Sequence, residues 1–251
     1  MKLVPAPLAV AVVIVAVVIG GRWPARADDP LPHTVRLPLV ARDVAQPDDP
    51  EPIAWPPPAD DAIVVAYPVS RATFDGTFVV FARVYNGTNT PVYNVRVDLV
   101  ARDASGAIVC DRFSLARPFV MDTLAEGVVS ISCDIDAAIV ASFDLRVTES
   151  WEAAVDDLPI GVETHLQQGS TSADWRIDRI TARNTSARDY TRAGVAVAYY
   201  DASGRAIAIS EAVIPDGLPA GGEVEVDVYL YQPGSLPPIA TAKVFPYAYV
   251  D

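Results

Sequence analysis

Short stretches of alternating apolar and polar residues run through the chain from about residue 62 to its end, and turn residues separate them. Alternation at every second residue is the pattern of a β-strand with one buried face. No stretch in this part shows the period of 3.6 residues that an amphipathic α-helix requires, so an all-β fold is predicted. In the first half, strands are expected at residues 62–67, 77–86, 92–103, 107–112, 127–135 and 143–148.

The tetrapeptide Asp-Ala-Ser-Gly occurs twice, at residues 103–106 and 201–204. Asn86 and Asp103 are separated by the same 17 positions as Asn184 and Asp201, so two landmarks share one offset of 98 residues. An apolar alternation leads into each copy of the tetrapeptide and another leads out of it. The sequence therefore contains one folding unit twice, with a strand, a turn and a strand around each tetrapeptide.

The strands before the two tetrapeptides have one apolar face each. These faces are expected to consist of Val95, Val97, Leu99 and Ala101 in the first copy and of Val195, Val197 and Tyr199 in the second. An aspartate can bond the backbone that follows it, and a glycine can adopt a positive φ angle. The motif therefore predicts hairpin turns rather than calcium loops, which need several oxygen side chains at alternate positions. The structural turn residues are Asp103, Gly106, Asp201 and Gly204.

A repeat of about 98 residues built from short strands matches an immunoglobulin-like sandwich, whereas propellers and solenoids repeat at shorter intervals. The segment Val197-Ala198-Tyr199-Tyr200-Asp201 also resembles the signature of the FxLYD-type domain family, and the corresponding residues 99–103 lack both aromatics. The resemblance covers residues 62–148 and 163–250. It implies a β-sandwich of exported bacterial or archaeal proteins, and it implies no catalytic residues.

We therefore predict an all-β protein with two tandem immunoglobulin-like β-sandwich domains, at residues 62–148 and 162–251, joined by a linker at 149–161. An apolar run near the N-terminus predicts a signal peptide at residues 1–27, with Ala25 and Ala27 at the positions that a signal peptidase recognises. An uncleaved membrane anchor is the alternative, because about 19 apolar residues can just span a bilayer.

Residues 28–61 are rich in Pro and Asp and predict a mostly disordered spacer. Within the spacer, residues 33–40 form a short apolar island. This island is either an edge strand of a sheet or simply part of the linker.

The formal net charge is −13, and it becomes −16 without the three basic residues of the leader, Lys2, Arg22 and Arg26. Such a charge argues against nucleic acid or anionic lipid as a partner, so a membrane is expected to be contacted only through an uncleaved N-terminal segment. Cys110 and Cys133 are the only cysteines, and in an exported chain they favour a disulfide.

Catalytic signatures are absent from the sequence. The two histidines, His33 and His165, are far apart, and no metal-ligand pair, Cys-x-x-Cys or nucleophile elbow accompanies them. We expect neither cofactor nor metal. An enzymatic alternative requires a composite site near the linker, formed by Trp151, Asp156, Asp157 and His165.

Tyrosines of the second copy are the remaining indication of ligand binding. Strand parity directs Tyr200 and Tyr229 away from the expected core, and Tyr190 and Tyr231 are further candidates. Asn86 and Asn184 stand in glycosylation acceptor sequences, but a turn role at equivalent positions of the repeat is sufficient to account for both.

The expected function is that of an exported, non-enzymatic structural or adhesive protein of the cell surface or the extracellular space. The alternative is a glycan- or peptide-binding module that uses the exposed tyrosines. The expected partner is an extracellular protein or glycan.

The leader prediction can be tested on native protein from its own cells. Cleavage after Ala27 gives an intact mass that begins at Asp28, in a soluble exported fraction. Intact-mass spectrometry of each cell fraction measures this, and a membrane-bound species that retains Met1 would establish the anchor instead.

Overall fold

The structure, a computed structural model, describes residues 34–37, 62–73, 75–153, 161–172, 174–231 and 236–249. All described strands belong to one compact unit, Leu31–Asp251. The predicted leader, most of the spacer and the centre of the linker lie outside the described residues. Within the described ranges, no helix has the length and hydrophobicity needed to cross a membrane.

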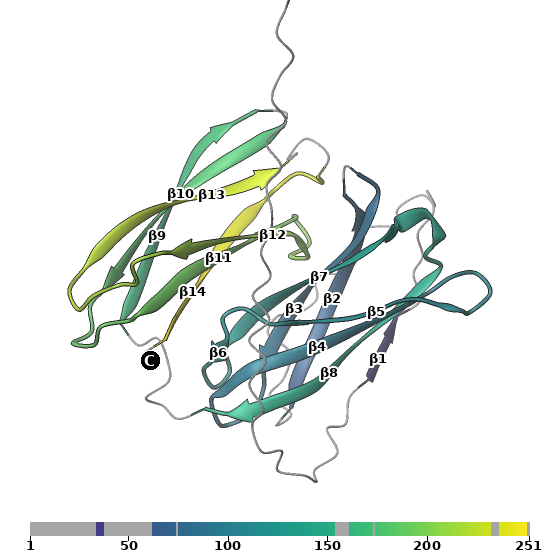
Figure 1. Cartoon of the computed structure of the whole chain (residues 1–251), viewed down its shortest axis with the longest axis horizontal. Coiled ribbons are helices and arrows are strands. Elements are labelled where there is room, and N and C mark those ends of the chain that lie inside the picture. The colour runs from purple at the N-terminus through teal and green to yellow at the C-terminus, as the bar shows by residue number, and fades with distance from the viewer. Residues whose placement is uncertain are drawn as a thin grey trace, which may run out of the picture. The chain divides into compact units, whose positions relative to one another are not determined.

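The first repeat consists of two antiparallel sheets (Figure 1). One sheet has the strand order β2-β3-β7, formed by β2 (Ile63–Ala72), β3 (Thr77–Asn86) and β7 (Glu126–Asp136). The other has the order β1-β8-β4-β5, formed by β1 (Thr34–Leu37), β8 (Ser142–Glu152), β4 (Val92–Arg102) and β5 (Ile108–Leu115), with β6 (Val120–Met121) paired to β4. A short 3₁₀-helix, η1 (Ala137–Ile139), connects β7 to β8.

The described strands of the second repeat have the same order as β2-β3-β7 and β8-β4-β5 of the first, without counterparts of β1 and β6. One sheet runs β9-β10-β13, formed by β9 (Val162–Thr171), β10 (Trp175–Asn184) and β13 (Glu223–Tyr231). The other runs β14-β11-β12, formed by β14 (Thr241–Tyr249), β11 (Arg192–Tyr200) and β12 (Ala206–Ile214). The all-β prediction is confirmed, and the duplicated sequence corresponds to a duplicated strand order.

In each repeat the two sheets enclose a sandwich-like apolar core. The face predicted for β4 is buried, as is the predicted face of β11. Val97 and Leu99 of β4 pack in one cluster with Val80 of β3 from the opposite sheet. Val195 and Val197 of β11 likewise pack with Val228 of β13. The alternation of the sequence therefore identified the inner faces.

The disulfide between Cys110 and Cys133 links the two sheets of the first repeat, with a Cα–Cα distance of 6.1 Å. Cys110 lies on β5, paired with Ala101, and Cys133 lies on β7. In the second repeat, Tyr199 of β11 and Ala208 of β12 are paired in the same way as Ala101 and Cys110. There a hydrogen bond of 2.9 Å from the Tyr199 hydroxyl to buried Asp178 spans the same sheets.

Both repeated asparagines fix the end of a strand. Asn86 is fully buried, and its amide nitrogen donates to the carbonyls of Thr90 and Asp122, at 2.9 Å and 3.0 Å. Asn184 is buried too, and it donates to the carbonyls of Arg188 and Leu218. The turn interpretation of these residues is supported, because the nitrogen that a glycan would modify is already engaged in the folded chain.

The two tetrapeptides form matching turns. The Asp103 carboxylate accepts hydrogen bonds from the backbone of Ser105 and Ala107, and Gly106 has a φ of 86°. The Asp201 carboxylate accepts from Ser203 and Arg205 in the same way, and Gly204 has a φ of 76°. Only glycine adopts such angles without steric cost.

The apolar island of the spacer contains a strand. Its backbone at Thr34–Leu37 pairs antiparallel with β8, with Thr34 opposite Arg146 and Leu37 opposite Phe143. Of the two alternatives for this island, the structure has the edge strand. It covers the open side of β8.

Replacing the disulfide by its counterparts in the second repeat tests what it contributes. The double variant Cys110→Ala, Cys133→Leu copies Ala208 and Leu230, and it should lower the free energy of unfolding by about 3 kcal/mol, because the cross-link closes a loop of 23 residues. Urea unfolding measures this. Unchanged stability, or two reactive thiols in the unreduced, denatured wild type, would contradict the expectation.

Candidate functional site

Strand β11 is buried on both faces. The side chains of Ala196, Ala198 and Tyr200 point away from the core of the second repeat, yet all three are buried. They pack in one apolar cluster with residues of the first repeat, namely Val79 and Phe81 of β3 and Val128 of β7, and with Ala206, Ile209 and Phe245 of the second. We call this contact between the two repeats the junction.

Small residues let the junction close. Gly194 of β11 lies opposite Tyr247 of β14, and a Cβ atom at Gly194 would come within 2.4 Å of the Tyr247 ring. The ring therefore lies over the glycine and reaches the first repeat, where it packs edge-on against Phe119 at 5.3 Å between ring centroids. An alanine at Gly194 would displace this ring.

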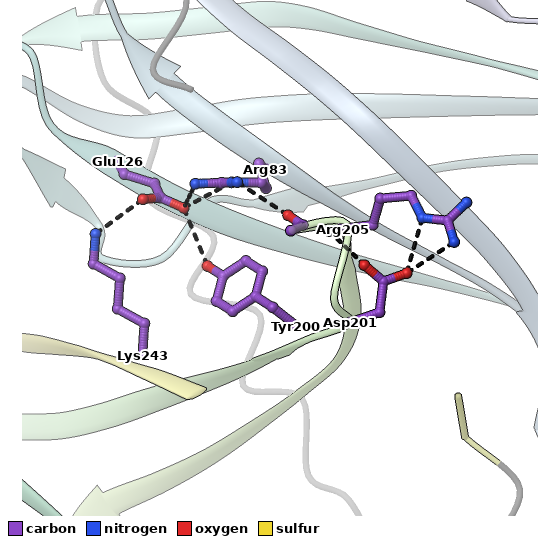
Figure 2. A network of polar contacts seen from close by, with 7 residues as sticks. Arg83, Glu126, Tyr200, Asp201, Arg205 and Lys243 are labelled. Atoms are coloured by element: carbon purple, nitrogen blue, oxygen red, sulfur yellow. Dashed lines mark hydrogen bonds and ion pairs between the residues drawn. The ribbon is translucent and has the colours of Figure 1, made fainter. Parts of the chain in front are cut away.

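A buried carboxylate occupies the polar side of the junction (Figure 2). Glu126, at the start of β7, has a side chain only 11% exposed. It pairs with Arg83 of its own repeat at 2.8 Å. From the second repeat it accepts hydrogen bonds from the Tyr200 hydroxyl at 3.1 Å and the Lys243 ammonium at 2.9 Å. Strands β3, β7, β11 and β14 thus meet at one carboxylate.

Arg83 extends this network to the second tetrapeptide. Its guanidinium donates to the carbonyl oxygen of Gly204 at 3.0 Å and lies 5.2 Å from the centroid of the Tyr200 ring (Figure 2). Asp201 holds the same turn through an ion pair of 2.8 Å with Arg205. The second turn is therefore both a hairpin turn and a contact of the junction.

Two further arginines of the first repeat contact the second repeat. Arg71 donates to the carbonyl of Ile207 at 3.2 Å, and burial lowers the pKa of its guanidinium. Arg117 pairs with Glu211 at 3.1 Å and lies over the Phe119 ring at 3.7 Å. Polar contacts therefore surround the apolar centre of the junction.

Electrostatics at the junction favour an ionised Glu126 and a neutral Tyr200. Burial by itself would raise the pKa of Glu126, but the hydrogen bond and charge of Lys243, with the charge of Arg83, hold it below its usual value. Burial and the neighbouring Glu126 charge raise the pKa of the Tyr200 phenol. The phenol therefore remains a hydrogen-bond donor at neutral pH.

A second buried acid lies inside the second repeat. Asp178 is fully buried on β10, and it accepts from Arg176 at 2.8 Å and from the Tyr199 hydroxyl. Burial, followed by the charge of Asp178, raises the pKa of Tyr199. Each neighbouring tyrosine of β11 thus donates to a different buried carboxylate.

The predicted site residues have different outcomes. Tyr200 was expected on the surface, and this was wrong: it is 4% exposed, because the first repeat covers it. Tyr190 is buried as well, whereas Tyr229 and Tyr231 are exposed as expected. The signal for Tyr200 was present in the sequence, since residues 193–200 form an almost unbroken apolar run, which is typical of a strand buried on both faces.

The residues of the composite enzymatic alternative lie on separate elements. Trp151 is on β8 and packs against the Tyr93 ring at 5.6 Å, whereas His165 is on β9, opposite Thr181. Among the described residues no hydrogen bond, ion pair or ring contact joins Trp151 to His165. Asp156 and Asp157 lie outside the described residues. The described part of the chain has no group of three or more His, Cys, Asp or Glu side chains that could hold a metal ion.

Comparison with known proteins gives little further information. No family model matches the chain, and no curated protein matches it. Among solved structures, it is similar to "The structure of a beta-glucuronidase from glycoside hydrolase family 2", with 12% identity and a TM-score of 0.22. That match covers 62% of this chain and 20% of the other, and a TM-score this low carries no argument about fold or function.

Neutralising Glu126 tests the electrostatic part of the junction. Glu126→Gln keeps the shape of the side chain but removes the charge that Arg83 and Lys243 face, so we expect a loss of about 3 kcal/mol of unfolding free energy at pH 7. The pKa of Glu126 is lowered in the folded state, so its contribution is present above the unfolded pKa of about 4.3 and disappears as pH falls through the folded value.

Urea unfolding between pH 3 and pH 7 makes this measurement. The difference between wild type and Glu126→Gln should shrink below about pH 4.3. Glu163→Gln on the exposed strand β9 is the control, and it should change stability by less than about 0.5 kcal/mol. A difference between Glu126→Gln and wild type that does not vary with pH would contradict the assignment.

Proposed function

We propose that this chain is an exported, non-enzymatic structural or adhesive protein of the cell surface or the extracellular space. Two immunoglobulin-like β-sandwich repeats of the FxLYD type make up its folded part. A leader at residues 1–27 directs export, and the Pro- and Asp-rich segment at 28–61, which contributes edge strand β1, connects the leader to the repeats. Its role is to hold two sandwich surfaces at a fixed spacing.

The observation that carries this proposal is the junction around Glu126. Domains joined by short linkers usually move relative to each other unless their interface is large and hydrophobic. Here an apolar centre is combined with a carboxylate that receives Tyr200 and Lys243 from the other repeat. Relative motion would expose Val79 and Phe81 and separate buried charged partners, so the two repeats act as one mechanical element.

Two properties of the chain support an extracellular location. Disulfides persist in oxidising compartments, and the Cys110–Cys133 bond is buried within the first repeat. The formal charge of −13 keeps such a protein soluble and away from anionic surfaces. Both properties fit a structural protein of the cell surface.

Protease accessibility on intact cells of the source organism tests the location. We expect the repeats in the exported fraction, where protease added outside the cells removes them. A protein found entirely in the cytoplasmic fraction and protected from protease would overturn the proposal.

The mechanical role is tested in a strain that lacks the protein. Surface integrity or attachment should decrease, and the wild type and Glu163→Gln should restore it. Glu126→Gln combined with Lys243→Ala should restore it only in part, although each repeat keeps its own core. Full restoration by this double variant would show that fixed spacing is not the function.

A further inference from the structure

The outer face of the sheet β9-β10-β13 carries three exposed aromatic side chains. Trp175 is 39% exposed, Tyr229 48% and Tyr231 66%. None of their side chains makes a hydrogen bond or ring contact with another described residue. Exposed aromatics of the first repeat differ, because Phe113 lies beneath Arg96 and Trp151 packs against Tyr93. Within the described residues, the second repeat thus presents aromatic side chains that are exposed and have no such partner.

Strand register places these aromatic residues in a continuous row. Trp175 is directly opposite Tyr231, and the next pair on the same face is Ile177 opposite Tyr229. The pair after that is Arg179 opposite Asp227. Because residues two apart on a strand are separated by about 7 Å, three such pairs extend over about 14 Å. The row therefore leads from an aromatic end to a polar end.

A hollow of about 200 Å³ lies at the polar end of the row. Its lining combines amide, hydroxyl, guanidinium and carboxylate groups with one apolar side chain: Gln167, Gln168, Gly169, Ser170, Ile177, Arg179 and Asp227. Pockets for drug-sized ligands have volumes of about 300–1,000 Å³, so this one suits a single ring of a longer ligand.

An irregularity of β9 shapes this hollow. The pairing of β9 with β10 shifts between Arg176 and Asp178, at the point where Gly169 passes the β10 backbone. A Cβ atom at Gly169 would lie 2.3 Å from the carbonyl oxygen of Ile177, so only glycine permits this approach. Strand bulges turn the neighbouring side chains and are common beside binding sites.

Acidic side chains outnumber basic ones on this face. Arg179 and Asp227 form an ion pair of 3.0 Å, Arg183 lies between Glu223 and Glu163, and Glu225 adds a further carboxylate near Arg179. This excess disfavours an anionic ligand, and the side chains still offer hydrogen-bond donors and acceptors. The ligand that complements this face is therefore free of negative charge, rich in hydroxyl groups, and extended, with apolar faces that fit aromatic rings.

We propose that the outer face of β9-β10-β13 binds a neutral polysaccharide. The rings of Trp175, Tyr229 and Tyr231 pack against the C–H faces of successive sugars, and one sugar enters the hollow beside Gly169. Its hydroxyls bond the side chains of Gln167, which lies opposite Arg179, and of Ser170 and Asp227. An extended peptide would instead add to a strand edge through main-chain bonds, and the groups described here lie on the sheet face. This inference does not depend on the structural role proposed above.

Affinity electrophoresis of the folded protein tests the proposal. Native gels containing mannan, laminarin, hydroxyethyl cellulose or xylan are the probes, with heparin as a polyanion and an array of extended peptides as comparisons. At least one neutral polysaccharide should retard the wild type. Trp175→Ala and Tyr229→Ala should each weaken that binding by about tenfold, since exposed aromatic anchors commonly dominate binding energy.

Three variants separate binding from folding. Phe113→Ala removes an exposed aromatic from the first repeat and should leave retardation unchanged. Gln167→Ala removes only a hydrogen-bonding group of the hollow, and it should weaken binding while the melting temperature is unchanged. Asp227→Asn should behave like Gln167→Ala.

The possible results of this experiment decide the proposal. Retardation by a neutral polysaccharide that depends on Trp175 and Tyr229, but not on Phe113, supports it. Absence of retardation by all four neutral polysaccharides overturns it. Binding to heparin or peptides alone overturns it too, and so does binding that survives both aromatic substitutions.

Discussion

A single carboxylate unites the two repeats of this protein. Glu126 is largely withdrawn from water, so its charge is tolerated only while Arg83 and Lys243 remain beside it. One partner comes from its own repeat and the other comes from the second repeat. Separating the repeats would break the contacts of Glu126 with Lys243 and Tyr200 and leave it with Arg83 alone. The apolar cluster around Phe81 and Ala198 adds to the same closure.

The two repeats share six strands in the same order, but equivalent positions have different contacts. Asp103 and Asp201 organise the same turn through the same acceptor atoms. Only the second turn is used by the junction, where Gly204 accepts a bond from Arg83. The connection between facing sheets has changed as well, from a covalent Cys110–Cys133 bond to a hydrogen bond between Tyr199 and Asp178.

Alternation along the chain predicted the six longer strands at residues 62–148, the inner faces of β4 and β11 and the two turns, because these depend on local chemistry, but it did not predict the short strand β6. The position of Asn86 and Asn184 at strand ends could be predicted for the same reason. The outer face of β11 was marked only by the almost unbroken apolar run of residues 193–200, and its cover by Val79, Phe81 and Val128 of the first repeat could not be predicted, because local chemistry does not say which distant strand packs on a face. The alternation of side chains along a strand correctly predicted that Tyr229 is exposed, but its prediction that Tyr200 is exposed was wrong. Alternation indicates which face of the sheet a residue occupies, not what covers that face.

Burial of β11 on both faces has a consequence for how that strand finds its place. Hydrophobicity normally prevents a strand from slipping by one residue, because slippage would carry its polar face into the core. A strand that is apolar on both faces lacks this safeguard. Here side-chain size and two hydroxyls replace it: Val195 and Val197 fill the core, while Ala196 and Ala198 fit the closer contact with the first repeat. A shift of β11 by one residue would direct Tyr199 away from Asp178 and Tyr200 away from Glu126. The two hydrogen bonds therefore favour the observed register of β11.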